Sequence, residues 1–425
     1  TWDLTAIFED MDEAESTLNA LQSKVYEADE AYIQGRALDE SSLDQMLRTA
    51  ERLQVYGMMV RDADLSDARA KAFETSVDAL VNKVIRLADM PIVEKEGPSI
   101  YELSGVYERI YKSFDHSYGA VFGDDPSLFS EDAQRRYKAF EKWTQDQAAA
   151  AEVYADIYEG KVNFDNYLAS LYGESEALEA VLTQDGFSQA AFAQLDAMTA
   201  ENLALNHRWM AVKARMLGVE GPLRFSDLFV NAFEMEEELS VPQGEALIKQ
   251  ALQPLPDIGQ SVVERAFDEA WIDYYPREGK AVGSYTYGAY DAHPFLLVNY
   301  SGTTESLAAL SHELGHAVHM TLSAQNQPFE IYYADIAASE LAASVTEILF
   351  HEYHLAHAEG REEKVAALAG YLDFLSSTYF DQMRMTEFEI EAHRMSQSGE
   401  DLSARSLGQL WNKLMAAYSR SEEHT

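Results

Sequence analysis

Along most of the chain, apolar residues recur three and four positions apart among charged residues. This is the period of an amphipathic helix, because residues i, i+3 and i+4 share one helix face. The pattern is clear in Asp44–Val55, Ala68–Leu87 and Glu131–Tyr158. It predicts a mainly α-helical protein, with helix following helix through the first two-thirds of the chain.

The pattern changes between Tyr274 and Thr304. Three glycines, at positions 279, 283 and 288, interrupt aromatic and β-branched residues, and Phe295–Tyr300 is the strongest strand candidate. Such a stretch predicts a small β-sheet or hairpin region. Thr303 or Thr304 can then cap the next helix. We therefore expect a small sheet next to a helix that begins near Thr304.

Length and composition restrict the class of protein. The 425 residues suffice for two or three structural units. We find no run of about 18 apolar residues, so we expect no membrane span. The absence of cysteine leaves metal binding to histidine and carboxylate, and it fits a reducing compartment. The opening residues Thr1–Thr5 lack the basic and apolar regions of a secretory signal, and we expect a cytoplasmic location.

The charge balance excludes one class of partner. Lys and Arg total 32 against 73 Asp and Glu, a formal net charge of −41. This charge repels phosphate backbones, so we expect no nucleic-acid partner. It can attract cationic peptides, or it can be a solvated acidic coat, and we favour the coat.

One short segment carries the chemistry. His312 and His316 are four positions apart on the predicted helix, so both can reach one ion from the same face. Glu313 lies beside them, in the place of a general base that takes a proton from a metal-activated water. The segment predicts one bound Zn²⁺ per chain. The alternative is a polar helix face with two surface histidines, but an apolar stripe embeds the helix: Leu307, Leu310, Leu314 and Val318.

A catalytic zinc ion needs a third protein ligand. His319 is on a neighbouring part of the same helix face, where we expect it to pack or to support the ligands. His351, His354 and His357 read as ordinary polar positions. The best candidate is Glu340, because it belongs to an apolar, alanine-rich helix in which a carboxylate requires a partner.

Glu340, Ser344 and Glu347 share one face of that second helix. The alternative is that they form the solvated stripe of an amphipathic helix. We favour Glu340 as a metal ligand and Glu347 as the support of a ligand histidine.

With these residues, the chain resembles oligoendopeptidase F of the thimet oligopeptidase family of zinc peptidases. The resemblance is carried by five segments in the family's order: Gly279–Tyr285, Pro294–Tyr300, Gly302–Ser306, His312–His319 and Glu340–Glu347.

The resemblance implies a two-lobed helical molecule with a deep channel that admits short, unstructured peptides. It implies Glu340 as third zinc ligand and endopeptidase cleavage in the cytoplasm. It also implies that an edge strand at Phe295–Tyr300 pairs with the substrate backbone. The expected substrate contacts are Phe295, Leu297, Asn299 and Tyr285. We expect residues 1–200 to form an N-terminal helical region and residues 201–425 the catalytic region.

Family members continue beyond the equivalent of Thr425, into a segment whose histidine and tyrosines stabilise the oxyanion, so we expect the chain to be C-terminally truncated. Within it, Tyr285, Tyr287 or His293 either line the cleft or pack in the sheet. Two other functions stay open. A metallocarboxypeptidase or dipeptidyl carboxypeptidase would hold the substrate's terminal carboxylate with a cation such as Arg277 or Lys280. A non-catalytic peptide-binding helical protein would lack the oxyanion segment.

Overall fold

The computed structural model describes residues 2–34, 36, 39–96, 126–171, 173–184, 186–233, 239–333 and 336–419. The chain divides into two compact units, each made of two stretches: Thr1–Glu108 with Glu236–His357, and Arg109–Met235 with Ala358–Thr425. Both units draw residues from either side of position 200, so they are not the two regions that the sequence predicts. The predicted division at residue 200 separates an N-terminal helical region from a catalytic region, and this assignment of function stays a prediction.

The first unit contains a sheet surrounded by helices. Its helices are α1 (Met11–Ile33), α2 (Glu40–Ala63), α3 (Ala68–Glu96), α9 (Val241–Ala251), α10 (Asp257–Asp268), α11 (Thr304–Asn326) and α12 (Ile336–His357), with short 3-10 helices at Leu4–Ala6 and Phe329–Ile331. Its strands are β1 (Ile272–Asp273), β2 (Tyr285–Tyr287) and β3 (Phe295–Leu297). The predicted fold, mainly helical with a small sheet against the helix that begins near Thr304, is confirmed.

The described part of the second unit is helical. Its α-helices are α5 (Ala133–Ala148), α6 (Ala151–Leu171), α7 (Ala177–Gln184), α8 (Gln189–Met216), α13 (Gly360–Leu375), α14 (Gln382–Ser398) and α15 (Ala404–Ser419), with 3-10 turns at Pro126–Phe129 and Phe225–Asp227 and a π-helical turn at Ser376–Asp381. The helical pattern of Glu131–Tyr158 is realised as α5 and α6, which are separated at Ala149 and Ala150 rather than continuous.

The sheet is mixed, and β3 lies in its centre. The strand order is β1-β3-β2, with β1 parallel and β2 antiparallel to β3. Leu296 pairs with Ile272 on one side and with Thr286 on the other. Backbone hydrogen bonds from the Val298 N–H to the Asp273 carbonyl and from the Tyr300 N–H to the Tyr274 carbonyl extend the pairing beyond the end of β3.

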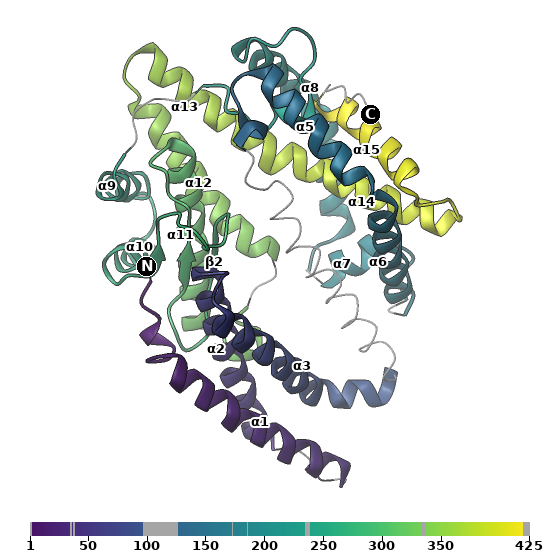
Figure 1. Cartoon of the computed structure of the whole chain (residues 1–425), viewed down its shortest axis with the longest axis vertical. Helices are drawn as coiled ribbons and strands as arrows, with labels where there is room; N and C mark the ends of the chain where they lie inside the picture. The colour runs from purple at the N-terminus through teal and green to yellow at the C-terminus, as the bar shows by residue number, and fades with distance from the viewer. Residues whose placement is uncertain are drawn as a thin grey trace. The chain divides into compact units, whose positions relative to one another are not determined.

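Successive side chains of β3 enter two different cores, because side chains alternate between the faces of a sheet. Phe295 and Leu297 pack in the core formed with α1, α2 and α3, whereas Leu296 and Val298 pack in the core formed with α9, α10, α11 and α12. In Figure 1, α1, α2 and α3 are drawn in purple to dark blue, and α9 to α12 in green. The two cores hold the sheet between the two sets of helices.

The prediction that Phe295–Tyr300 is an edge strand open to a substrate backbone is therefore wrong. Both edges of β3 are occupied by β1 and β2. An uninterrupted apolar run such as Phe295–Val298 reflects burial on both faces of a sheet and does not distinguish an edge strand from a central one. The pairing of β3 with both β1 and β2 decides that it is central. Among the described strands, β2 has an unpaired edge.

Helix α11 begins as the sequence predicts and packs closely on α12. Thr303 is the N-cap, and its side chain accepts a hydrogen bond from the Ser306 backbone N–H. Gly315 faces α12 without a side chain. A Cβ there would lie 2.3 Å from the Thr346 hydroxyl oxygen and 2.6 Å from the Ala343 Cα. The glycine therefore lets the two helices approach at backbone distance.

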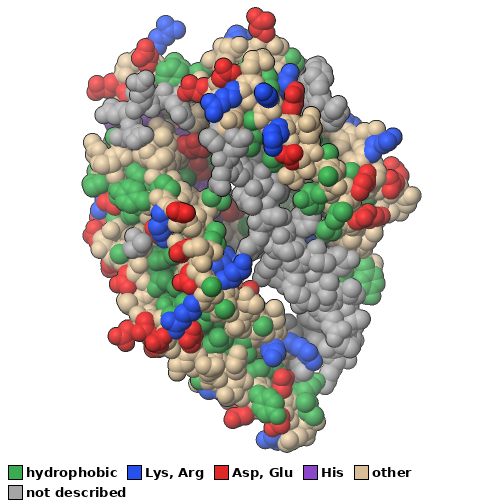
Figure 2. Space-filling model, in the orientation of Figure 1, with side chains coloured by type: hydrophobic (Ala, Val, Ile, Leu, Met, Phe, Trp, Pro, Cys, Tyr) green, Lys and Arg blue, Asp and Glu red, His purple; other side chains and the backbone are tan. Residues whose placement is uncertain are grey.

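Acidic side chains are spread over one face of the described part of the protein. Figure 2 shows Asp and Glu scattered among Lys, Arg and apolar groups on the face it draws, outside the grey residues. On this face, the distribution fits a solvated acidic coat. Among the described helices, none combines the length and the apolar character that crossing a bilayer requires.

Replacing Gly315 by Ala will destabilise the protein, because the new methyl group meets backbone atoms that cannot move aside. We expect the free energy of unfolding to fall by about 1–3 kcal/mol. The control is Gly370→Ala in α13, where an added Cβ meets nothing within 4 Å. That variant is expected to be neutral or stabilised by up to about 1 kcal/mol. Chemical denaturation measures both, and equal stability of the two variants would contradict the close contact.

Candidate metal centre

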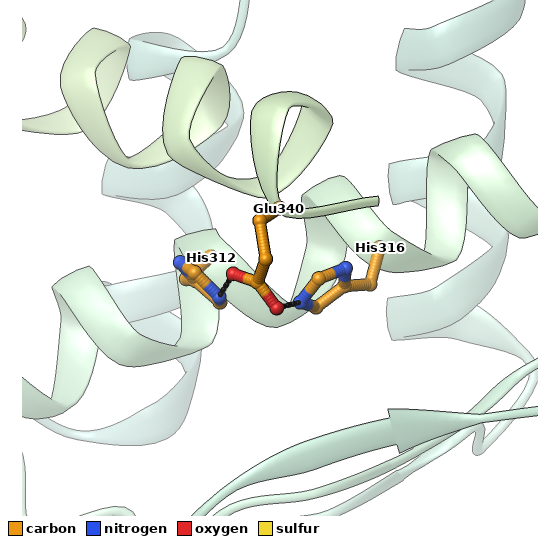
Figure 3. A group of neighbouring side chains, drawn as sticks. All are labelled: His312, His316 and Glu340. Atoms are coloured by element: carbon orange, nitrogen blue, oxygen red, sulfur yellow. Dashed lines mark ion pairs between the residues drawn. The ribbon is translucent and has the colours of Figure 1, made fainter. Parts of the chain in front are cut away.

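Three side chains from two helices converge on one point. His312 and His316 come from successive turns of α11, and Glu340 comes from the first turns of α12. The His312 Nε2 atom lies 3.4 Å from Glu340 Oε2, and the His316 Nε2 atom lies 3.5 Å from Glu340 Oε1 (Figure 3). One donor atom from each residue lies within 4.8 Å of the other two. This is the only such histidine and carboxylate group among the described residues.

The other nitrogen of each imidazole has its own partner. His312 Nδ1 lies 2.9 Å from Glu347 Oε2, and His316 Nδ1 lies 2.9 Å from the Ser339 hydroxyl oxygen. A proton on each Nδ1 satisfies both contacts and leaves the Nε2 lone pairs directed at the shared point. The rings are thereby oriented for an ion before one binds.

These donors fit a zinc ion. Two neutral imidazole nitrogens and one carboxylate are the ligand set of catalytic zinc sites, which keep a fourth position for water or substrate. The convergence of the three donor atoms, together with the partnered Nδ1 atoms, meets the geometric requirement. The fit concerns the residue types and their placement, and other divalent ions accept the same donors.

Without a metal ion, a proton on His312 balances part of the negative charge of the neighbouring carboxylates. Burial lowers the pKa of His312, but hydrogen bonds to Glu340 and Glu347 outweigh it and raise that pKa to about 10. Burial and the neighbouring His312 lower the pKa of His316. The hydrogen bond from His312 lowers the pKa of Glu340. A bound cation thus takes the place of a proton on His312, so metal binding is weakened by acid.

Glu313 is a buried carboxylate beside the ligands. Its side chain is almost inaccessible to solvent, and the Thr286 hydroxyl lies 2.7 Å from its Oε2 atom. Burial raises the pKa of Glu313 to about 7, although the Thr286 hydrogen bond acts in the opposite direction. A carboxylate with a pKa near neutrality can both accept and release a proton at physiological pH.

Glu347 contacts His312 and a second histidine, and its role as the support of a ligand histidine stays a prediction. Burial opposes its charge, but the hydrogen bond with His312 and the nearby His351 side chain outweigh that effect and lower the pKa of Glu347. His351 is buried, with its Nε2 atom 3.9 Å from Glu347 Oε1. His357 is exposed and bonds the Tyr353 carbonyl, so it lies outside the ligand group.

The structure gives the surroundings of three further predicted site residues: His319, Tyr285 and Asn299. His319 is partly buried, and its Nδ1 atom has no hydrogen-bond partner among the described residues. The Tyr285 hydroxyl bonds Asp62, and the Asn299 amide donates to the Ala281 and Gly283 carbonyls. The supporting role of His319 and the substrate role of Tyr285 and Asn299 stay predictions.

Phe295 and Leu297 require a correction. Their side chains have 0% exposed surface and belong to the core that α1, α2 and α3 form with the sheet. Their backbone groups on the β2 side are paired as well. Because β3 is the central strand, neither Phe295 nor Leu297 offers a side chain or a free backbone edge to a substrate.

The sequence patterns do not predict two contacts of the site. Ser339 precedes Glu340 directly and orients His316, and Thr286 contacts Glu313 from β2. The sequence signal for Ser339 is its position next to the candidate ligand Glu340. For Thr286 we see no local signal, because 27 positions separate it from Glu313.

Zinc offered to the protein will bind at about one ion per chain, and His316→Ala will abolish that binding. Glu347→Gln is expected to bind zinc about 10- to 100-fold more weakly, because His312 loses the carboxylate that orients it. The exposed His357→Ala serves as control and is expected to bind as the wild type does. Native mass spectrometry measures the stoichiometry, and competition with a chelator measures the affinity. A wild-type chain that stays metal-free in excess zinc would contradict the site.

Comparison with known proteins agrees with this geometry. The model of peptidase family M3 matches residues 253–424, a stretch that includes all three candidate ligands. The chain is 24% identical to the group B oligopeptidase PepB of Streptococcus agalactiae, over 98% of this chain and 80% of that protein. It is 28% identical to the chromosomal oligoendopeptidase F of Lactococcus lactis, over 68% of this chain and 48% of that protein.

The fold has solved counterparts. The crystal structure of oligoendopeptidase F from Enterococcus faecium superposes with a TM-score of 0.59 at 18% identity, covering 96% of this chain and 80% of that one. The structure of PZ peptidase A superposes with a TM-score of 0.66 at 16% identity, covering 95% of this chain and 80% of that one. The stretch that holds His312, His316 and Glu340 thus matches peptidase family M3, and the resemblance of the chain to oligoendopeptidase F is confirmed.

Proposed function

We propose that the protein is a zinc-dependent endopeptidase that hydrolyses internal bonds of short, unstructured peptides. The observation that carries the proposal is the convergence of His312, His316 and Glu340 next to the buried carboxylate of Glu313. The family match and the named relatives support the coarser statement that the chain is a peptidase. Zinc, the general base and the endopeptidase specificity are the finer parts of the proposal.

Each residue of the site has a defined task in this mechanism. His312, His316 and Glu340 hold the metal, while Glu347 and Ser339 orient the two rings. When bound, the zinc ion acts as a Lewis acid toward the scissile carbonyl and the attacking water. Glu313 accepts a proton from that water through its carboxylate and delivers it to the amine that leaves. Thr286 holds the Glu313 carboxylate through its hydroxyl.

The carboxypeptidase alternative loses its two candidate cations. Arg277 forms two hydrogen bonds with the Asp273 carboxylate, at 2.8 and 2.7 Å. The Lys280 ammonium group is buried and donates to the carbonyls of Asp273, Tyr275 and Val298. Both cations therefore stabilise the ends of β1 and β3. Neither is available to a substrate carboxylate, which favours the endopeptidase.

The non-catalytic alternative is disfavoured by the contents of the site. A protein that only binds peptides has no need of a base that is 5% exposed and held by a hydroxyl, beside three converging ligands. The proposed partners are short peptides, without nucleic acid, because the formal net charge is −41. We also propose a cytoplasmic location, which rests on the absence of cysteine.

Glu313→Gln will strongly reduce hydrolysis while zinc stays bound. The amide cannot accept the proton, so we expect the turnover of an end-blocked peptide to fall about 10²- to 10⁴-fold. The control is Glu305→Gln at the exposed start of the same helix, which is expected to keep wild-type turnover. Mass spectrometry of the products locates the cut. Cleavage restricted to peptides with a free C-terminus would favour a carboxypeptidase instead.

The pH dependence of kcat/KM will show an acidic limb from Glu313. Burial raises the pKa of this carboxyl to about 7 in the metal-free site, and a nearby cation lowers it. Because the base must be ionised, kcat/KM is lost as pH falls through the pKa of Glu313. With rising pH, kcat/KM increases until the pH exceeds that pKa, which lies at or below about 7. Assays from pH 5 to 9 measure the limb. Activity that is highest at pH 5 would remove Glu313 from this role.

A further inference from the structure

His351 lies in the interior of the first unit, one helical turn beyond Glu347 on α12. Although its spacing is that of an ordinary polar position, only 4% of its surface is exposed. Its imidazole packs against the Phe350 ring, with 5.6 Å between the ring centroids. Burying an imidazole costs free energy unless a polar group of the protein compensates for the lost water. The burial of His351 therefore directs attention to the polar group that it approaches.

That polar group is the Glu347 carboxylate. The His351 Nε2 atom lies 3.9 Å from Glu347 Oε1, while Glu347 Oε2 lies 2.9 Å from Nδ1 of His312. The first distance suits an ion pair or a contact bridged by one water molecule, and the second is that of a direct hydrogen bond. One carboxylate thus lies between two imidazoles, with a different oxygen nearest to each.

The order of these groups follows from the packing of α11 on α12. His312 contacts Glu347 and His316 contacts Ser339, so the two helices run in opposite directions. Glu347 and His351 are four positions apart and are neighbours on one face of α12. His351 therefore lies on the side of Glu347 that is farther from Glu340, and its route to the metal ligands leads through the Glu347 carboxylate.

A second partner on Glu347 restricts the side chain that receives His312. The carboxylate is planar, so holding one oxygen limits where the other can lie. A glutamate side chain has several rotatable bonds, and fixing it in one arrangement costs conformational entropy. If Glu347 is already held by His351, less of this entropy is lost when the carboxylate orients His312. The His312 ring then keeps the orientation and the tautomer that leave its Nε2 atom for the metal.

We propose that His351 is a positioning residue that holds the Glu347 carboxylate in place and thereby orients the metal ligand His312. Its contact with Glu347 is direct and its effect on His312 is indirect, so its loss weakens metal binding. The inference rests on the metal site of the proposed function and adds a residue to it. The alternative is that His351 only fills space where the helices pack.

Replacement of His351 separates the two roles, because zinc affinity is measured by competition with a chelator and depends on no activity. His351→Leu keeps the volume but removes the polar contact, and we expect zinc to bind about three- to tenfold more weakly. His351→Gln has an amide N–H near the Nε2 position and is expected to bind within about twofold of the wild type. His351→Asn has the same amide on a shorter side chain that stops short of Glu347, and it is expected to bind as weakly as the leucine variant.

A matched control is His354→Leu on the same helix. The His354 ring stacks on the same Phe350 ring, with 5.9 Å between the centroids, but it is seven positions from Glu347, about two helical turns. Its replacement alters the same packing, and we expect zinc affinity equal to that of the wild type. Equal losses of affinity in His351→Leu and His354→Leu, or a glutamine variant as weak as the asparagine variant, would overturn the positioning role.

A double variant tests whether His351 acts through Glu347. In a Glu347→Ala background no carboxylate joins the two rings, so His351→Leu is expected to weaken zinc binding no further. Losses that add in the double variant, or a wild-type affinity in His351→Leu alone, would overturn the inference. A wild type that binds one zinc ion but cleaves no end-blocked peptide would instead overturn the proposed function, and the measured affinities would still decide the role of His351.

Discussion

The close contact between α11 and α12 is the constraint on which the candidate metal centre depends. His312 and His316 belong to one helix and Glu340 to the other, so the separation of the helices sets the distance from the carboxylate to the imidazoles. At Gly315 an added Cβ would lie 2.6 Å from the Ala343 Cα, so the helices meet almost backbone to backbone. Metal ligand distances tolerate only a few tenths of an ångström, which makes this contact a requirement of the site.

The carboxylates of the site are of one chemical type, but their surroundings separate them. Glu340 has a pKa lowered by its hydrogen bond from His312, and Glu347 has a lowered pKa because its histidine partners outweigh burial. Glu313 belongs to α11, and burial raises its pKa to about 7. Two of the groups thus stay ionised to hold a ring or a metal, while the third is able to exchange a proton near neutral pH.

The sheet shows how a local pattern can be interpreted incorrectly. The resemblance to a known family suggested an exposed edge at Phe295–Tyr300, yet β3 lies in the centre of the sheet. Phe295, Leu296 and Leu297 form a continuous apolar run, which is typical of a strand buried on both faces. Tyr285–Tyr287 alternates in its surroundings, with the Thr286 side chain against Glu313 and the two tyrosines in the core formed with α1, α2 and α3.

The sequence alone determined what depends on local periodicity. The helical fold, the small sheet, the N-cap at Thr303 and the shared face of His312 and His316 all follow from spacing along one segment. The prediction that Glu340 points toward those histidines follows from its place in an apolar helix. Only the tertiary structure decided that Ser339 orients His316, that Thr286 contacts Glu313, and that Arg277 and Lys280 are engaged within the sheet. These contacts join different elements of the fold, and a local period carries no information about the distance between two elements until the chain packs.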